Sequence, residues 1–100
     1  MIEQIYISGP MTGYEDNNYP LFNLVADWIV RGGNAAINPA ETGAIDTARI
    51  DDPEWHDYMM SAIDRMRDAT AIHFIKGWWR SYGAWIEFIV AKKMKLKVIK

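Results

Sequence analysis

Cysteine is absent from this chain of 100 residues. Without thiols the protein has no disulfide framework, no thiolate nucleophile and no cysteine metal site. The two histidines, His56 and His73, lie far apart in the sequence, and no cluster of other metal-binding side chains accompanies them. We therefore expect no metal site and no cofactor.

The chain also lacks a long hydrophobic run, since no window approaches the roughly 20 apolar residues that a membrane span needs. The charged Glu3 lies where a signal peptide would be apolar, so we expect a cytoplasmic protein with no membrane partner. The net charge of −2 argues against a partner that is a nucleic acid polymer. Lysines crowd the C-terminal end, where we expect them to complement a helix C-terminus: Lys92, Lys93, Lys95, Lys97 and Lys100.

Half of the residues are hydrophobic, and a chain of this length fits one domain spanning residues 1–100. Five tryptophans among 13% aromatic residues exceed what a monomer of this size buries comfortably. The composition therefore favours a homodimer or a higher homo-oligomer. Its interface candidates are Trp85 with the third predicted helix, and either Trp78 or Trp79.

The hydrophobic pattern alternates between strand and helix periods. Four runs read as strands, at residues 2–8, 35–37, 69–75 and 96–99. Between them lie a helix behind Pro20, a second helix that begins at residues 51–54, and a third that runs to about Met94. This order predicts an α/β fold of doubly wound, flavodoxin- or Rossmann-like type. Its four-stranded parallel sheet has the order 2-1-3-4, with helices on both faces.

Ligands of such sheets bind beyond the carboxyl ends of the strands. Gly9-Pro10-Met11 follows the first strand and precedes a helix, so its backbone N–H groups are candidates for a ligand cradle. The alternative is an ordinary β-to-α turn. Asn38 closes the second strand, and the polar connection at residues 40–52 is a candidate lid.

Glu87 is the candidate catalytic carboxylate, because it stands alone in the apolar run 84–91. Burying a carboxylate is costly unless hydrogen bonds or charges compensate it, and a nearby helix N-terminus favours the anion. A poorly solvated carboxylate is suited to act as a nucleophile or to stabilise an oxocarbenium ion. The alternative is a glutamate on the solvent face of an amphipathic helix, above Lys92 and Lys93.

Three motifs resemble the nucleoside 2-deoxyribosyltransferase superfamily, and in particular its small phage and prophage branch. They are Gly9-Pro10-Met11, Asn38-Pro39 and the segment SYGAWIE at residues 81–87. The resemblance covers residues 5–99 and implies cleavage or transfer at the glycosidic bond of a nucleoside or nucleotide. In that superfamily the glutamate that matches Glu87 attacks the anomeric carbon of a 2-deoxyribosyl group.

Ser81 stands six residues before Glu87. The transferases carry an aspartate there, whereas the related deoxynucleoside 5′-phosphate N-hydrolases carry a serine that binds phosphate, so the resemblance favours a nucleotide. The alternative is that Ser81 only caps the third helix. The candidate substrate-binding residues are Tyr6, Gly9, Pro10, Met11, Asn38, Trp78, Ser81 and Gly83.

Two of these residues also have plain structural interpretations. Tyr6 matches an aromatic position near the sugar in some members of the superfamily, but a tyrosine in a core strand also serves packing. Trp78 and Trp79 stand between Lys76 and Arg80. They are suited to stack a base beside a phosphate, and equally to form a dimer contact.

Ala62 departs from the superfamily pattern, because the enzymes carry an aspartate there. Asp64 lies about 200° further around the helix and cannot replace it. The alternative functions are therefore a catalytically inactive nucleotide-binding or sequestering protein on the same fold, and a protein-interaction module.

Overall fold

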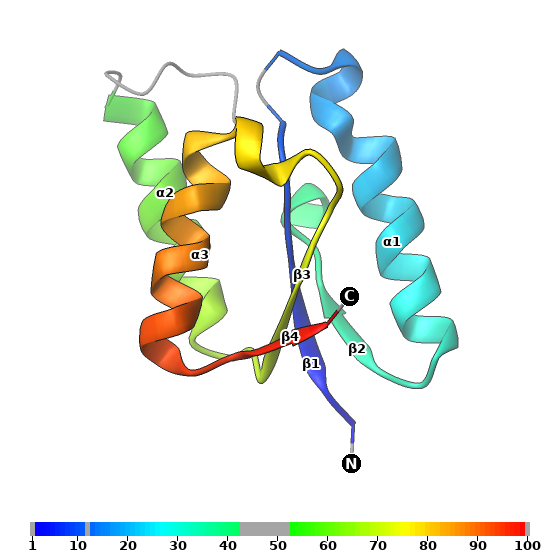
Figure 1. Ribbon diagram of the computed structural model, residues 1–100. Helices are drawn as coiled ribbons and strands as arrows, with labels where there is room; N and C mark the ends of the chain where they lie inside the picture. Colours follow the sequence, from blue (N-terminus) through cyan, green and yellow to red (C-terminus); the bar gives the residue numbers. More distant parts are fainter. Residues whose placement is uncertain (1, 12, 43–52, 100) are drawn as a thin grey trace.

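The computed structural model describes residues 2–11, 13–42 and 53–99 (Figure 1). Most of the candidate lid, residues 43–52, lies outside the described residues. The strands are β1 Gln4–Ser8, β2 Ala35–Ile37, β3 Ala71–Phe74 and β4 Lys97–Ile99. The α-helices are α1 Tyr19–Arg31, α2 Pro53–Met66 and α3 Tyr82–Met94, and the 3-10 segments are η1 Glu15–Asn18, η2 Pro39–Thr42 and η3 Trp78–Arg80.

The four strands form one parallel sheet in the order β2-β1-β3-β4. This confirms the predicted fold class and strand order, including the parallel pairing of β4. Ile5 stands opposite Ala36 on one side and Ala71 on the other, so β1 occupies the centre of the sheet beside β3. The carboxyl ends of all four strands therefore lie along the same edge.

Helices cover both faces of the sheet, with α1 on one side and α2 and α3 on the other (Figure 1). Successive side chains of a strand point to opposite faces, and β1 divides its residues accordingly. Ile5 and Ile7 join the core beneath α1, whereas Tyr6 joins the core beneath α2 and α3. The predicted double-sided burial of β1 is thus confirmed.

The buried face of α1 differs from the one that the largest apolar residues suggest. Phe22, Ala26 and Ile29 are buried against the sheet, while Leu24 and Trp28 are exposed. A helix rich in apolar residues offers more than one stripe at 3.6-residue spacing. The small side chain of Ala26 lets α1 approach the sheet closely, which favours the stripe that contains it.

Three of the strands are shorter than the apolar runs that predicted them, whereas β2 has the predicted bounds. β1 begins at Gln4 and β3 spans only Ala71–Phe74, because pairing, and not apolar composition, defines where a strand ends. α3 ends at Met94, as expected. None of the helices in the described residues is long and apolar enough to cross a membrane.

Candidate functional site

Glu87 lies in α3 with its carboxylate buried against β1, and only 5% of the residue is exposed. The hydroxyl of Tyr6 donates a hydrogen bond of 2.5 Å to Oε2. The hydroxyl of Ser8 donates a second bond of 2.6 Å to Oε1. The carboxylate is therefore held at both oxygens by two alternate residues of one strand. Because Glu87 is buried, the solvent-face alternative is wrong.

Tyr6 and Ser8 share a face of β1 because side chains two residues apart in a strand point the same way. That face looks toward α2 and α3, where Tyr6 is fully buried. The sequence analysis does not identify Ser8 as a site residue, since a serine at the end of an apolar run is typical of the start of a turn. The period-two spacing from Tyr6 was the signal that would have found it.

Two opposing effects act on the ionisation of this carboxyl group. Removal from water disfavours the charged form, whereas hydrogen bonds donated to the carboxylate favour it. Bonds to a charged acceptor contribute about 1.5–3 kcal/mol each, whereas burying an isolated ionised carboxylate costs far more than burying a neutral polar group. The two hydroxyl donors thus offset part of the cost of an anion at this position.

Ala62 of α2 is fully buried in the same cluster as Tyr6. Asp64, two residues further along the helix, is exposed and forms an ion pair of 2.9 Å with Arg67. Asp64 therefore points away from Glu87 and does not supply the missing carboxylate, as the helical spacing predicts.

The turn Gly9-Pro10-Met11 is packed tightly into the protein. A Cβ atom on Gly9 would lie 2.8 Å from Cβ of Ile75, so only glycine fits beside β3 at this position. Met11 belongs to the core beneath α1, and the backbone oxygen of Pro10 accepts a hydrogen bond of 2.9 Å from Asn18. The side chains of this turn thus have structural roles, and a ligand contact through its backbone stays a prediction.

The buried side chain of Asn38 ties the end of β2 to its surroundings. Its Nδ2 donates to Oδ1 of Asn23 at 2.9 Å, and its own Oδ1 accepts from the backbone N–H of Ala40 at 3.0 Å. Asn38 forms an Asx-type turn at the start of η2. This structural role explains the asparagine at this position, and it requires no ligand.

Ser81 is the N-cap of α3, and its Oγ accepts a hydrogen bond of 3.2 Å from the backbone N–H of Ala84. The capping role is confirmed, while a role in phosphate binding stays a prediction. Gly83 lies where α2 and α3 meet, and a Cβ there would lie 3.2 Å from Sδ of Met59. Gly83 thus allows the close approach of the two helices.

Trp78 belongs to an aromatic cluster on the other flank of α3. Its ring centroid lies 4.7 Å from that of Phe74, 4.8 Å from that of Trp85 and 5.4 Å from that of Phe88. Trp78 and Phe88 line a cavity of about 560 Å³, whose lining does not include Glu87. The structure therefore separates Trp78 from the residues that hold the carboxylate.

The described residues hold no group of three histidine, cysteine, aspartate or glutamate side chains placed to bind a metal ion. The arrangement defines a parallel α/β protein with one buried, hydroxyl-clamped carboxylate between its central strand and its last helix.

The chain belongs to a family described as a domain of unknown function, DUF4406, whose profile matches residues 3–100. No curated protein and no solved structure matches the chain. The resemblance to the nucleoside 2-deoxyribosyltransferase superfamily therefore stays a prediction that rests on the sequence motifs.

Replacing Ser8 with alanine removes one of the two donors to the buried carboxylate. We expect Ser8→Ala to lower the free energy of unfolding by about 1.5–3 kcal/mol, the contribution of a hydrogen bond to a charged group. Urea denaturation measures this loss. Ser61→Ala, which removes an exposed hydroxyl of α2, is the matched control and should change stability by less than about 0.5 kcal/mol. Equal effects of the two substitutions would contradict the role of Ser8.

Proposed function

We propose that the protein binds a deoxynucleoside 5′-monophosphate or a nucleoside and cleaves or transfers at its N-glycosidic bond, with Glu87 as the nucleophile. The observation that carries the proposal is the clamped carboxylate of Glu87, buried between β1 and α3. A second support is the motif resemblance, which assigns this same glutamate the role of nucleophile. The proposed reaction uses no metal or cofactor.

In the proposed reaction a carboxylate oxygen of Glu87 forms a bond to the anomeric carbon while the bond from that carbon to the base breaks. The base leaves with the electron pair and takes a proton from water. A water molecule, or an acceptor base, then attacks the glycosyl ester and restores the carboxylate. The hydroxyls of Tyr6 and Ser8 would hold the carboxylate in one orientation through both steps.

A second candidate is a nucleotide-binding or sequestering protein that has lost catalysis. The observation in its favour is Ala62, which is buried beside Tyr6 where the resembled enzymes carry an aspartate. An alanine neither donates nor accepts a proton. Under this proposal a nucleotide would raise the melting temperature, because a ligand that binds only the folded state stabilises it. No base would be released.

We also propose that the protein is a homodimer that uses the outer face of α3. Tyr82, Trp85 and Ile89 are exposed at spacings of three and four, so they form one apolar stripe. The opposite face of α3 is buried inside the protein, so the helix carries an exposed apolar stripe in addition to its packed face. An exposed apolar stripe on a helix is usually covered by another surface. In a two-fold dimer the second copy of the chain covers it with the same stripe.

Glu87→Gln tests the proposed nucleophile, because the amide keeps the shape of the side chain and loses its nucleophilicity. Chromatography measures the release of the base from a deoxynucleoside 5′-monophosphate. We expect the rate of this release to fall to the background rate in the variant. Calorimetric affinity for the same nucleotide should stay within a few-fold. Glu15→Gln, an exposed position in η1, is the control and should keep full turnover. Turnover that persists in Glu87→Gln would eliminate this residue as the nucleophile.

Ser81→Asp and Ser81→Ala together test whether Ser81 recognises phosphate. Wild-type protein should prefer the monophosphate over its nucleoside by about tenfold or more, since one charge-assisted hydrogen bond contributes about 1.5–3 kcal/mol. Both variants should lose this preference when affinities are measured at fixed salt. Only Ser81→Ala should also lose about 1 kcal/mol of stability, because aspartate remains a good N-cap. Equal affinity of the wild type for nucleoside and monophosphate would leave Ser81 with a purely structural role.

Ile89→Glu tests the dimer, because it places a charge on a residue that is 57% exposed at the C-terminal end of the α3 stripe. Light scattering at high micromolar concentration should report a dimer for the wild type and a monomer for Ile89→Glu. The control is Leu24→Glu on α1, which is equally exposed and should remain dimeric. A wild-type protein that is monomeric at this concentration would contradict the proposed dimer.

A further inference from the structure

A cavity of about 560 Å³ lies at the free edge of the sheet, beside β3 and β4. Aromatic side chains from three elements line it: Phe74 of β3, Trp78 and Trp79 of η3, and Phe88 of α3. Lys76 and His73 add polar groups to this lining. The cavity has the size that one small organic ligand commonly occupies.

The aromatic wall is already assembled in the protein without a ligand. The rings of Phe74, Trp78 and Phe88 contact one another in pairs, with centroids 4.7–5.8 Å apart. Trp79 stands at the rim and is 51% exposed. Because the three inner rings are fixed by one another, only Trp79 and the ligand need to become ordered when a flat ligand stacks on Trp79.

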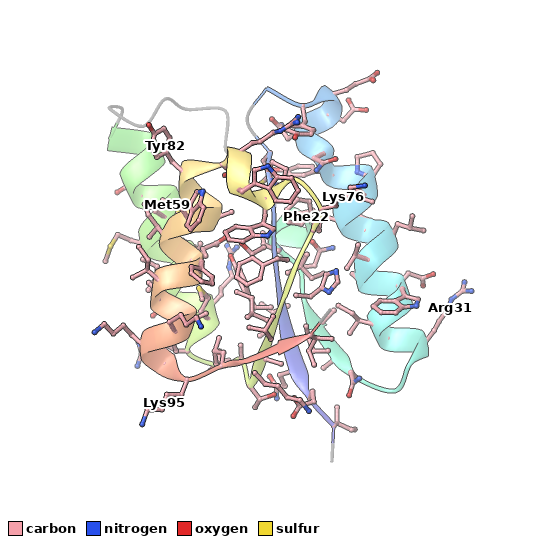
Figure 2. The ribbon with its side chains drawn as sticks, viewed as in Figure 1. Phe22, Arg31, Met59, Lys76, Tyr82 and Lys95 are labelled. Carbon is pink, nitrogen blue, oxygen red and sulfur yellow. The ribbon has the colours of Figure 1, made fainter. Side chains whose placement is uncertain are left out.

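The charge around the cavity is positive. Figure 2 shows Lys76 on the loop that follows β3. Among the described residues, no ion pair involves Lys76 and no carboxylate lines the cavity. Lys92 lies over the ring of Phe88, 5.5 Å from its centroid, and Lys97 is exposed on β4. An anionic group at this edge would therefore meet cations without a competing acid.

His73 adds a polar atom to the same lining. Its Nδ1 lies 3.0 Å from the backbone oxygen of Ile99. Since a carbonyl oxygen only accepts hydrogen bonds, Nδ1 carries the hydrogen in this contact. The ring also packs against Trp28 of α1, with centroids 6.1 Å apart.

This cavity is separate from the carboxylate of Glu87. Glu87 contacts Tyr6 and Ser8 on β1, whereas the next residue of α3, Phe88, contacts Phe74 on β3. Neighbouring strands lie about 4.8 Å apart, so the cavity beside β3 and β4 is displaced from Glu87 by one to two strand spacings. Neither Glu87, Tyr6 nor Ser8 lines it.

We propose that this aromatic, basic cavity is a second binding site that takes a free nucleotide, with the base stacked on Trp79 and the phosphate beside Lys76. Aromatic rings stack any nucleobase, and a lysine is a common phosphate ligand. A single nucleotide suits a cavity of this volume, and the net charge of −2 disfavours a polymer. The proposal does not rest on catalysis at Glu87.

Titration of ¹⁵N-labelled protein with a deoxynucleoside 5′-monophosphate, at low and at moderate salt, tests the site. The amides of Val98 and Ile99 line the cavity and report its occupancy, whereas those of Ser8 and Gly9 report occupancy near Glu87. We expect Val98 and Ile99 to shift, with an affinity that falls as salt rises. Trp79→Leu should weaken that affinity at least about fivefold, since it removes one stacking ring. Lys76→Ala should weaken it several-fold and reduce its salt dependence.

Two matched controls keep the test specific. Leu24→Ala removes an exposed apolar side chain of α1 that does not line this cavity, and Lys93→Ala removes an exposed lysine outside it. Both should leave the shifts of Val98 and Ile99 unchanged. The backbone oxygen of Trp79 accepts a 2.8 Å bond from Nε1 of Trp85, and this acceptor remains in Trp79→Leu, so the variant should fold.

Three outcomes would overturn the proposal. Shifts confined to Ser8 and Gly9 would place all binding at Glu87. Equal weakening by Leu24→Ala and Trp79→Leu would show that binding does not depend on the cavity. A short oligothymidylate that binds more than tenfold tighter than the monophosphate would make a single strand, and not a free nucleotide, the ligand of this surface.

Discussion

Two hydroxyl groups on the central strand hold the carboxyl group of Glu87 inside an otherwise apolar layer. The bonds from Tyr6 and Ser8 to Glu87 join residues 81 and 79 positions apart, and they fix how α3 crosses the sheet. A folded domain is stable by only about 5–15 kcal/mol, so a buried carboxylate without such donors would consume a large share of that margin. The position of α3 sets the positions of Ser81, the aromatic cluster and the outer apolar stripe in turn.

The two flanks of α3 have different chemistry because a helix turns by about 100° per residue. Glu87 faces a polar pair on β1, and Phe88 faces aromatic rings on β3 and η3. Ala62 fills the space beside Tyr6 with a methyl group, so α2 contributes packing there and no proton donor. The protein thus separates a site suited to chemistry from a surface suited to stacking, on one helix.

The sequence was sufficient to predict the strand order and the two helical layers, because these follow from periodicity. A charge in an apolar run indicated a buried Glu87 but left the solvent-face alternative open. The sequence was not sufficient for the contacts of Glu87. Whether α3 lies over β1 or over β3 depends on side-chain volumes across the whole layer, and Ser8 has no distinguishing feature as a lone residue. For the same reason α1 buries Ala26 and exposes Trp28, although tryptophan is the more apolar by size.

The alternation along β1 has a consequence for how the chain finds its native pairing. A slip of one position would exchange the faces of the strand and bring Ile5 and Ile7 against Glu87 in place of Tyr6 and Ser8. The charge would then be buried among methyl groups with neither hydroxyl to solvate it. The carboxylate therefore makes a shifted register of β1 unfavourable during folding. In a wholly hydrophobic layer the same shift would be much less destabilising.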